Sequence, residues 1–563
     1  MGKSMDIDCL LIGHNEMSFS EYEADIRGMG VNSGAYRDLN LNFILYNNRP
    51  YTITEIFNIF HYQAHENKNS TQMLHIAKSF SAAIAYLGTY LHRRGYHFDY
   101  VNSFQYSKKE LAEKLRKENI LTIAIITTLY VSALPIIEII QFIRTYNQTA
   151  KIIVGGPFVS TKARTLAPGE FEYLLQTTIG ADFFVNSSQG EAALVKIIHA
   201  LKNNLNPGDI NNIYFRAGDT IKSTPTAREN NKLSRNMVNW DLFKDNAGEH
   251  VNIRTSISCP FSCSFCGFPQ HAGQYQVAPV EMIEAELKKL DQIETVKSVH
   301  FIDDTFNVPG KRFKEILRMI IKNKFGFKWH SYFRCQFADR EMMELMKTSG
   351  CEGVFLGLES GNDLILKNMN KAVRSENYLP GIELLKEYGI VTFGNFIIGF
   401  PGETEETVND TLKFIQTSGL DFFRTQLWYC EPITPIWKDK DRYNIKGESF
   451  EWSHATMNYQ RACDLIENIL LTLDTPTWIP QYNFDFDSFW HLVHRSMTIP
   501  QVENFLKSFN LAIKEKLLAP SPGDVSYEVL KKIQDASLNR DTIASSDEEE
   551  STLIDTAEAA FDF

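Results

Sequence analysis

The chain has 563 residues, of which 44% are hydrophobic and 22% charged. It is too long for a single hydrophobic core, so we expect several domains. The net charge is −12, but eight of the acids and no base lie in the last 23 residues, 541–563. The rest of the chain is close to neutral, which does not favour a nucleic-acid partner. Its apolar runs are interrupted by polar residues and no signal sequence is evident, so we expect a cytoplasmic protein without a membrane partner.

Residues 1–205 alternate strand and helix patterns. The expected strands lie at 7–13, 97–104, 121–130, 150–160 and 181–187. Such alternation predicts βαβ units, and therefore an α/β fold with a doubly wound parallel sheet of the Rossmann-like type. Ligands on these sheets bind beyond the carboxyl ends of the strands. Those ends are expected at Gly13–Asn15, Thr127–Tyr130, Gly155–Pro157 and Ser187–Glu191.

The first strand is not followed by a G-x-G-x-x-G motif, which argues against a nicotinamide or flavin dinucleotide site. A long insertion, 13–75, opens at this edge instead, and insertions of that size are usually functional. Residues 206–245 are rich in Asn, Gly and Pro, so we expect a linker there.

A second strand–helix series occupies residues 246–440. It contains six expected strands with helices between them, which predicts a partial (β/α)6 barrel. In barrels of this kind the chemistry gathers at the carboxyl ends of the strands. We expect a small α-helical region at 441–540 and a disordered acidic tail at 541–563.

Three of the eight cysteines follow the first barrel strand in a C-x3-C-x2-C pattern: Cys259, Cys263 and Cys266. In a large intracellular chain, cysteines favour metal binding or core packing over disulfides. Structural zinc sites use four ligands, and His271 is a candidate fourth ligand. A cubane iron–sulfur cluster held by only three thiolates leaves one iron open to an outside ligand. The remaining cysteines are scattered, and we expect them in the core.

This triad, with Phe265 before its third cysteine and a barrel downstream, resembles the radical S-adenosylmethionine (SAM) superfamily. The resemblance implies a [4Fe–4S] cluster whose open iron chelates SAM and cleaves it reductively, so no side chain is expected to act as acid or base. Asp304 is implied as a contact of the methionine amine, although a helix cap is an alternative there. Arg334 is implied as a carboxylate contact, with a buried structural pair as its alternative. By the same resemblance, the SAM-binding residues are Phe265, Tyr275, Asp304, Arg334, Glu359, Ser360 and Ile398.

The N-terminal half resembles the cobalamin-binding domain found in a large subclass of that superfamily. The residues implied to line the nucleotide tail and the corrin edge are Asn15, Thr127, Thr128, Gly155, Gly156, Pro157, Gly190 and Glu191. The D-x-H-x-x-G loop that supplies an axial histidine in other cobalamin proteins is absent. His14, His61, His65 and His75 do not stand in that pattern, so we expect the lower face of the cobalt to meet water or a non-ligating side chain of the 13–75 segment.

Within this subclass, the chain resembles in particular the P- and C-methyltransferases of natural-product pathways, including those of the phosphinothricin type. The resemblance implies that a methyl group passes from SAM through methylcobalamin to an unactivated carbon or a phosphinate phosphorus. The substrate would be a small molecule or a carrier- or peptide-bound intermediate, and the electron donor a flavodoxin or ferredoxin. The alternatives are a non-methylating oxidation, cyclisation or ring rearrangement, a methylthiotransferase, and a cobalamin carrier or sensor with a structural metal site.

Overall fold

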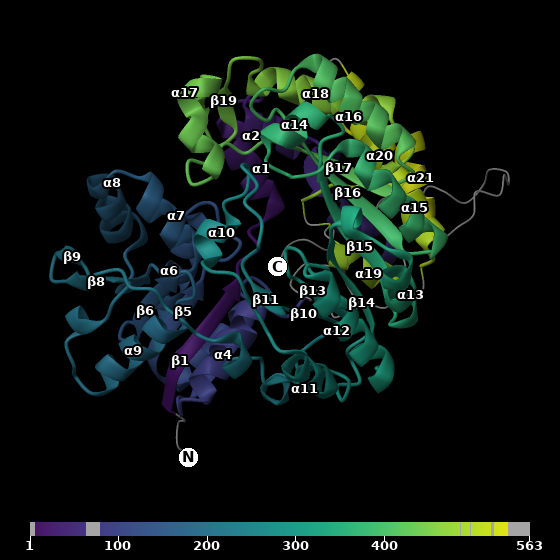
Figure 1. Ribbon diagram of the computed structural model, residues 1–563. Coiled ribbons are helices and arrows are strands. Elements are labelled where there is room, and N and C mark those ends of the chain that lie inside the picture. The colour runs from purple at the N-terminus through teal and green to yellow at the C-terminus, as the bar shows by residue number, and fades with distance from the viewer. Residues whose placement is uncertain are drawn as a thin grey trace, which may run out of the picture.

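The computed structural model describes residues 6–62, 79–482, 484, 486–495, 497–519 and 523–538. Two seven-stranded sheets organise these residues. The N-terminal sheet and its helices form one side of the molecule, and the second sheet with the C-terminal helices forms the other (Figure 1). In the part of the chain that is described, no helix combines the length and hydropathy that crossing a bilayer would require. His65, His75 and the acidic tail 541–563 lie outside the described residues.

The N-terminal sheet has the strand order β4-β1-β5-β6-β7-β8-β9. Its first five strands are parallel: β4 (Phe98–Ser103), β1 (Asp6–His14), β5 (Asn119–Ile126), β6 (Lys151–Gly155) and β7 (Phe183–Val185). In chain order this is 2-1-3-4-5, one of the two common doubly wound arrangements. The predicted parallel α/β sheet is therefore present.

Alternation along β1 shows why both faces of this sheet are covered by helices. Cys9 and Leu11 join one hydrophobic cluster, while Leu10 and Ile12 join another. Successive side chains of a strand point to opposite faces, so an unbroken apolar strand needs cover on both sides. The first face packs α4 (Ala82–His92) and α9 (Glu191–Lys202), and the second packs α5 (Lys108–Lys117), α6 (Leu134–Tyr146) and α7 (Pro157–Thr165).

The segment expected to be a linker is partly a hairpin. Strands β8 (Ile213–Ala217) and β9 (Thr220–Ser223) extend the N-terminal sheet in antiparallel fashion. Gly218 lies between them at φ +65°, a left-handed conformation that suits glycine in a hairpin turn. The polar composition of residues 206–245 concealed these two edge strands, because an edge hairpin does not need apolar side chains on both faces.

The second sheet has the order β10-β13-β14-β15-β16-β17-β20, and all of its strand pairs are parallel. Its members are β10 (His250–Ile253), β13 (Ser298–Phe301), β14 (Lys328–Phe333), β15 (Cys351–Glu359), β16 (Val391–Ile398), β17 (Phe422–Leu427) and β20 (Thr477–Trp478). Helices α11 (Val280–Leu290), α12 (Gly310–Asn323), α13 (Arg340–Thr348), α15 (Leu379–Glu387) and α16 (Glu405–Thr417) alternate with these strands. The six expected strands are present, and a seventh adds to the expected partial barrel.

The region expected to be purely helical, 441–540, contains strands as well. It supplies the seventh strand, β20, and a hairpin of β18 (Lys446–Glu448) and β19 (Glu451–Ser453). Its main helices are α18 (Tyr459–Thr472), α19 (Phe486–His494), α20 (Ile499–Leu518) and α21 (Tyr527–Ser537). Strands of two or three residues are too short to produce a recognisable alternation, so the sequence did not reveal them.

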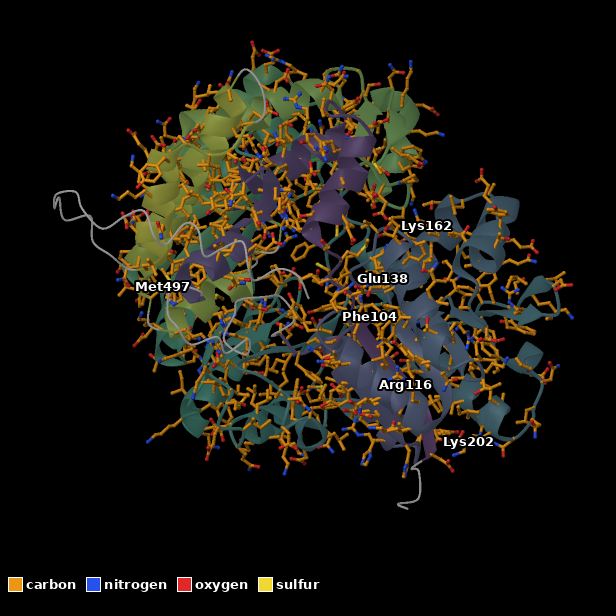
Figure 2. All side chains as sticks on the ribbon, turned by 180° about the vertical axis from the view of Figure 1, so that it is seen from behind. Phe104, Arg116, Glu138, Lys162, Lys202 and Met497 are labelled. Carbon is orange, nitrogen blue, oxygen red and sulfur yellow. The ribbon has the colours of Figure 1, made fainter. Side chains whose placement is uncertain are left out.

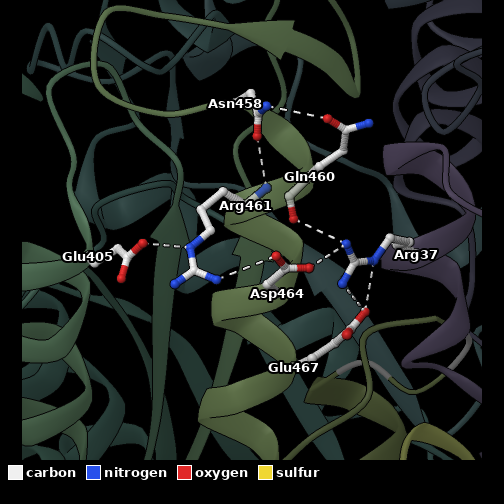
Figure 3. Close-up of polar contacts among 7 residues, drawn as sticks. All are labelled: Arg37, Glu405, Asn458, Gln460, Arg461, Asp464 and Glu467. Carbon is white, nitrogen blue, oxygen red and sulfur yellow. Dashed lines mark hydrogen bonds and ion pairs between the residues drawn. The ribbon is translucent and has the colours of Figure 1, made fainter.

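The long insertion contacts the C-terminal helices, far from its position in the sequence. It holds α1 (Phe19–Gly28), α2 (Gly34–Asn40), the hairpin β2 (Phe43–Tyr46) and β3 (Arg49–Thr52), and α3 (Ile53–Phe57). Figure 1 shows α1 and α2, in purple, among the green elements that follow the barrel. Arg37 of α2 pairs with Asp464 at 2.8 Å and with Glu467 at 2.7 Å, both on α18 (Figure 3). The insertion therefore links the N-terminal part of the chain to the helices that follow the second sheet.

Figure 2 gives the view from behind. Glu138 of α6, Arg116 of α5, Lys162 of α7 and Lys202 of α9 all lie on the N-terminal side of the molecule, whereas Met497, just before α20, lies on the opposite side. The carboxyl ends of the parallel N-terminal strands face the cysteine-bearing loop of the second sheet, through the contacts described below.

Candidate active site at the facing edges of two sheets

The cysteine triad lies in a loop after β11 (Ser256–Ile257), which follows the first barrel strand. Ser258 has φ +66° and turns the backbone directly before Cys259. Further along, the Ser264 backbone donates to Met369 O at 2.8 Å and accepts from the Ile436 N–H at 2.9 Å. The loop is thus fixed by backbone hydrogen bonds to two distant segments, and it holds the thiols without help from a helix or strand.

Asp303 fixes the start of this loop. Its carboxylate accepts hydrogen bonds from the backbone N–H of Thr255 at 2.7 Å and of Ser256 at 2.8 Å, and also from the Thr255 hydroxyl. Asp303 is buried, and its partners are all polar groups that would otherwise lack acceptors. Asp303 therefore has a structural role, whereas its neighbour Asp304 lines the cavity.

The spacing of the thiols does not suit a single zinc ion. Two groups of three potential ligand atoms within 4.8 Å of one another occur among the described residues, and neither contains a cysteine. Zinc with sulfur ligands at about 2.3 Å would bring those sulfurs within about 3.8 Å of each other. His271 lies away from the triad, since its ring contacts Ser160 Oγ at 3.3 Å and Thr161 Oγ1 at 3.4 Å. The alternative of a Cys3His zinc site is therefore wrong.

The three cysteines border a cavity of about 190 Å³ at the carboxyl ends of the barrel strands. The structure brings seven of the expected cluster and SAM residues to its wall: Cys259, Cys263, Cys266, Phe265, Asp304, Arg334 and Glu359. The wall also contains Phe261, Pro269, Thr305, Tyr332, Phe333, Phe355, Gly357, Lys371 and Asn395, which the sequence analysis missed. Tyr332 stands two residues before Arg334, and Gly357 and Phe355 stand two and four residues before Glu359, so a count by twos back from those two expected residues would have found them.

Arg334 covers the first part of the cysteine loop. Its guanidinium carbon lies 3.6 Å from the centroid of the Phe261 ring, and its Nη2 lies 3.5 Å from Cys263 Sγ. Arg334 is buried, and its Nη1 has no hydrogen-bond partner among the described residues. A buried donor of this kind needs an acceptor, so the cavity offers a place for an anionic group beside Cys263.

Glu359 and Lys371 form a buried ion pair in the cavity wall. Lys371 Nζ lies 2.8 Å from Glu359 Oε1, and Asn395 Nδ2 donates to Glu359 Oε2 at 3.2 Å. The side chains of Glu359 and Lys371 are 8% and 5% exposed. Glu359 has φ +71°, so the strand end is turned to aim this carboxylate. Lys371 comes from the loop after α14 (Asp363–Asn368), and no motif in the sequence indicates it.

Asp304 faces the cavity opposite these groups, and burial raises the pKa of its carboxyl group to about 7. It does not cap a helix, because α12 begins at Gly310, six residues later. Burial also raises the pKa of the Cys266 thiol to about 12. Near neutral pH, with nothing positive in the cavity, the Cys266 thiol is therefore protonated and the Asp304 carboxyl group is about half protonated, and a bound cation would favour loss of both protons.

Three expected SAM residues lie outside the cavity wall. The Tyr275 hydroxyl donates to Val308 O at 3.1 Å, and Ser360 Oγ contacts Thr411 Oγ1 at 3.2 Å. Ile398 is fully buried at the end of β16. The structure therefore does not bring these three side chains together with the seven others. Cys335, Cys351, Cys430 and Cys463 are buried, as expected of core residues.

The carboxyl ends of β5 and β6 form a tight backbone junction. Thr127 donates to Gly155 O through its N–H and through its hydroxyl, each at 3.0 Å. Gly156 has φ +123°, and a Cβ placed there would lie 2.7 Å from Thr127 Oγ1. Pro157 then starts α7, and Thr128 is exposed beside the junction. Glycine is required at this point of the strand edge, which lets another molecule approach the backbone closely.

Gly190 and Glu191 begin α9 at the end of the next strand. Gly190 has φ +81°, and Glu191 is buried, with its Oε2 accepting from Asn231 Nδ2 at 3.0 Å. Arg254, next to the cysteine loop, lies 3.6 Å from Glu191 Oε1. Burial raises the pKa of the Glu191 carboxyl group. These two residues lie at the same edge of the sheet as Thr127 and Gly156.

Asn15 was expected at this edge as a ligand contact, but its side chain is used within the protein. Its Nδ2 donates to Pro135 O at 3.1 Å and to Glu138 Oε2 at 2.9 Å, and its Oδ1 accepts from Gln105 Nε2 at 2.8 Å. Asn15 is 2% exposed. It ties β1 to α6, and the expectation that it faces a ligand is wrong for this structure. The neighbouring His14 is half-buried, and burial lowers the pKa of its imidazole to about 4.

The glycine-rich edge and the cysteine loop face each other. The short helix α10 (Phe268–Ala272), directly after Cys266, packs on α7 through His271, and Arg164 donates to Gln270 O at 3.0 Å. A Cβ built on Gly273 would lie 3.4 Å from Ser188 Oγ, so the segment after α10 also lies close to the loop after β7. The carboxyl edge of the N-terminal sheet and the cysteine loop, which are far apart in the sequence, therefore lie on opposite sides of one interface.

Apolar side chains are exposed beside this interface. Leu129, Val131 and Leu134 follow β5 and are 62%, 72% and 48% exposed. The segment after the carboxyl end of β5 therefore presents several apolar side chains to solvent.

Comparison with known proteins agrees with this arrangement. The Radical SAM superfamily matches residues 253–415. An uncharacterised methyltransferase of Pyrococcus horikoshii is 26% identical over 302 residues, which are 52% of this chain and 64% of that protein. The anaerobic magnesium-protoporphyrin IX monomethyl ester cyclase of Cereibacter sphaeroides is 26% identical over 381 residues, 64% of this chain and 60% of that protein. The chain therefore spans less than two thirds of the length of these relatives.

Among solved structures, the radical SAM methyltransferase TsrM of Kitasatospora setae, with cobalamin and a [4Fe–4S] cluster bound, matches 82% of this chain and 96% of its own. The TM-score is 0.60 and the sequence identity 15%, so the likeness concerns the fold. Residues 253–415 of this chain are a radical SAM domain, carried on a fold that is shared with a radical SAM methyltransferase.

Proposed function

We propose that this chain is a cobalamin-dependent radical SAM methyltransferase. The observation that carries the proposal is that a three-cysteine loop, open on a charged cavity, directly faces a glycine-rich sheet edge with exposed apolar residues. The names of the matched relatives include a methyltransferase, and the matched structure is one with cobalamin and a cluster. The site and its facing edge lie in one chain, so both cofactors would share one space.

The residues fit a [4Fe–4S] cluster. Cys259, Cys263 and Cys266 would supply three thiolates, and this triad is not among the groups of described residues whose ligand atoms all lie within 4.8 Å of one another, as a single ion would need. When bound, the cluster, SAM and cobalamin would supply a substrate-activating radical and a transferable methyl group. The protein would contribute the positions of these groups and a space that excludes water.

The cavity wall offers matched charges for the amino-acid end of SAM. Arg334 Nη1, buried without a hydrogen-bond partner among the described residues, would donate to the carboxylate. Asp304 and Glu359 would accept from the ammonium, with Lys371 and Asn395 holding Glu359 in place. Phe265 would pack beside the adenosine. Tyr275, Ser360 and Ile398 would then support the wall from behind, since their side chains do not reach the cavity.

The N-terminal edge offers glycines and apolar side chains that would suit a corrin. Gly155, Gly156, Pro157 and Gly190 leave the backbone open to close approach, while Leu129, Val131 and Leu134 offer apolar area for a macrocycle. Thr127, Thr128 and Glu191 supply polar atoms for its amide groups. Asn15 is excluded from this set by its bonds to α6.

The transfer that we propose carries a methyl group from SAM, by way of cobalamin, to an unactivated carbon or a phosphinate phosphorus of a natural-product intermediate. The substrate would be a small molecule or a carrier- or peptide-bound group, and a flavodoxin or ferredoxin would supply electrons.

Anaerobic reconstitution of the full chain with iron, sulfide and hydroxocobalamin tests the proposal. With SAM, a reductant and candidate substrates, we expect both S-adenosylhomocysteine and 5′-deoxyadenosine, together with a product heavier by one methylene unit. Cys263→Ala should lower the production of 5′-deoxyadenosine by more than about 100-fold, because a cluster ligand is lost. Cys463→Ala, a buried cysteine elsewhere, is the matched control. Unchanged turnover in Cys263→Ala contradicts the proposal.

A second candidate is a cobalamin-binding radical SAM enzyme that does not methylate but oxidises, cyclises or rearranges a ring. The match to an anaerobic cyclase over 64% of this chain favours it. The two candidates differ in their products. Formation of 5′-deoxyadenosine without S-adenosylhomocysteine would select the second candidate, and formation of both selects methyl transfer.

A further inference from the structure

A second cluster of titratable side chains lies in the barrel below the cavity. His330 of β14 stands two residues before Tyr332, which lines the cavity, so both side chains point to the same face of the sheet. His300 of β13 is the parallel neighbour of His330. The two histidines therefore form the layer beneath the cavity floor, nearer the amino ends of the strands.

Helix α19 adds a carboxylate to this pair. Asp487 Oδ1 lies 3.0 Å from His300 Nδ1 and 3.1 Å from His330 Nε2. The three side chains are 12%, 7% and 0% exposed, respectively. The three ligand atoms all lie within 4.8 Å of one another. Strands β13 and β14 each supply one imidazole nitrogen, and helix α19 supplies one carboxylate oxygen, around a single enclosed point.

These separations suit one metal ion. Zinc bonds of about 2.0 Å to nitrogen and oxygen, in tetrahedral geometry, place neighbouring ligand atoms about 3.3 Å apart. The observed nitrogen–oxygen distances of 3.0 and 3.1 Å require shifts of a few tenths of an ångström. Two imidazoles and one carboxylate are also a ligand set that divalent iron and zinc take in other proteins.

The charge of Asp487 supports a cation at this point. The ion pairs of Asp487 in the described part of the chain are with His300 and His330, and none is with Lys or Arg. A buried carboxylate that pairs with no Lys or Arg side chain is a favourable ligand for a bound cation.

The buried polar atoms around this point also lack partners. His300 Nε2 and His330 Nδ1 have no hydrogen-bond partner among the described residues. These two nitrogens are not the ones that face Asp487, so the ion would leave them free to bond water or another polar group. The nearby group Glu249, His250 and His491 is a weaker candidate, because Arg495 already pairs with the Glu249 carboxylate at 3.1 Å.

We propose that His300, His330 and Asp487 bind a divalent first-row metal ion, separate from the cysteine triad, that clamps α19 across the floor of the barrel. The ion would take two imidazole nitrogens and one carboxylate oxygen from the chain and a water as its fourth ligand. It would hold the layer on which Tyr332 rests, and so it would support the cavity without touching the substrate. This inference does not depend on the proposed reaction.

Zinc chloride is the probe. The full chain, with its cysteine cluster reconstituted anaerobically, is dialysed against zinc and then against buffer, and bound zinc is counted by mass spectrometry. We expect one zinc ion per chain, with X-ray absorption showing nitrogen and oxygen ligands at about 2.0 Å. Zinc should also raise the melting temperature by several degrees, because it binds the folded chain alone. Asp487→Asn, which keeps the shape of the side chain, should reduce bound zinc at least tenfold.

His199→Gln, on the exposed surface of α9, is the matched control and should bind zinc as the unaltered chain does. No bound zinc, or zinc with sulfur ligands at about 2.3 Å, overturns the proposal. Equal zinc content in the unaltered chain and in Asp487→Asn also overturns it. The absorption spectrum of the unaltered chain decides the ligand type even where a variant folds poorly.

Discussion

Arg334 lies with its guanidinium carbon 3.6 Å from the ring centroid of Phe261, the aromatic residue between Cys259 and Cys263. A planar cation stacked on a ring is held in one orientation, and its unused N–H groups point in a fixed direction. The relationship couples the cysteine loop to the third barrel strand, so that the anion-binding group moves with the thiols.

Arg334→Lys tests this coupling. Lysine keeps the charge but loses the stacked plane and the fork of donors, so we expect SAM to bind about tenfold more weakly. Isothermal titration of the reconstituted chain with SAM measures the change. Arg340→Lys, on the exposed surface of α13, should bind SAM normally. Equal affinity in both variants would show that Arg334 does not contact the ligand.

Lys371→Met removes one partner of the buried pair with Glu359. The carboxylate would remain in the cavity wall without its cation, so we expect a loss of about 3–5 kcal/mol in the free energy of unfolding. The double variant with Glu359→Gln should recover at least about 1 kcal/mol, since the uncompensated charge is gone. Denaturant unfolding measures both values. Lys367→Met, which is exposed on α14, is the control.

Gly156→Ala adds a methyl group where a Cβ would lie 2.7 Å from Thr127 Oγ1, in a backbone conformation with φ +123°. We expect a loss of about 1–3 kcal/mol in the free energy of unfolding and a cobalamin affinity lower by about tenfold or more. Absorbance titration with hydroxocobalamin follows the second effect. Gly169→Ala, where a Cβ would meet no atom within 4 Å, should leave both quantities unchanged.

Stability should depend on pH through Glu286. This carboxyl group is buried and accepts from Trp240 Nε1 at 3.0 Å, and burial raises its pKa from the usual 4.5 to about 8. Since the folded chain keeps this proton where the unfolded chain loses it, the contribution is favourable below about pH 4.5 and is lost as the pH rises to about 8. The melting temperature of Glu286→Gln should therefore fall less between pH 5 and 8 than that of the unaltered chain, and parallel curves would count against this assignment.

Arg37→Ala tests the docking of the insertion on α18. Arg37 bonds Asp464, Glu467 and Gln460 O, and its side chain is 17% exposed (Figure 3). We expect a loss of about 1–2 kcal/mol and faster proteolysis of the segment around α2, measured by denaturant and by limited digestion. Arg461→Ala, whose pairs lie on the exposed side of α18, should change stability by less than about 0.5 kcal/mol.

Strands buried on both faces were predictable, because an apolar run between turn residues has few other uses. This holds for β1, β5 and β6 and for the barrel strands β13 to β17. The position of the cavity was predictable from local features of the sequence. The three cysteines, Arg334 and Glu359 each stand in a motif at or just after the end of a predicted strand, and they line the cavity.

The groups that escaped prediction depend on contacts far apart in sequence. Lys371 reaches the cavity only because its loop folds back on Glu359, and Asn15 turns away because α6 offers it better partners. The strand Thr477–Trp478 and the hairpin at Gly218 are too short to show a period. Nothing near Asp487 in the sequence indicates that it meets histidines of two barrel strands.

The second sheet receives its last strand and its floor, α19, from residues that leave the ribosome after nearly 500 others. Helix α2, made long before α18, finds this partner equally late. Because translation proceeds from the N-terminus, the second sheet and its cysteine loop remain incomplete until β20 and α19 have been made. Contacts between residues so far apart in sequence also form slowly. Iron and sulfide delivered to the nascent chain would meet a cysteine loop whose sheet still lacks β20 and α19. We therefore expect the cluster to be assembled after the chain has been released from the ribosome.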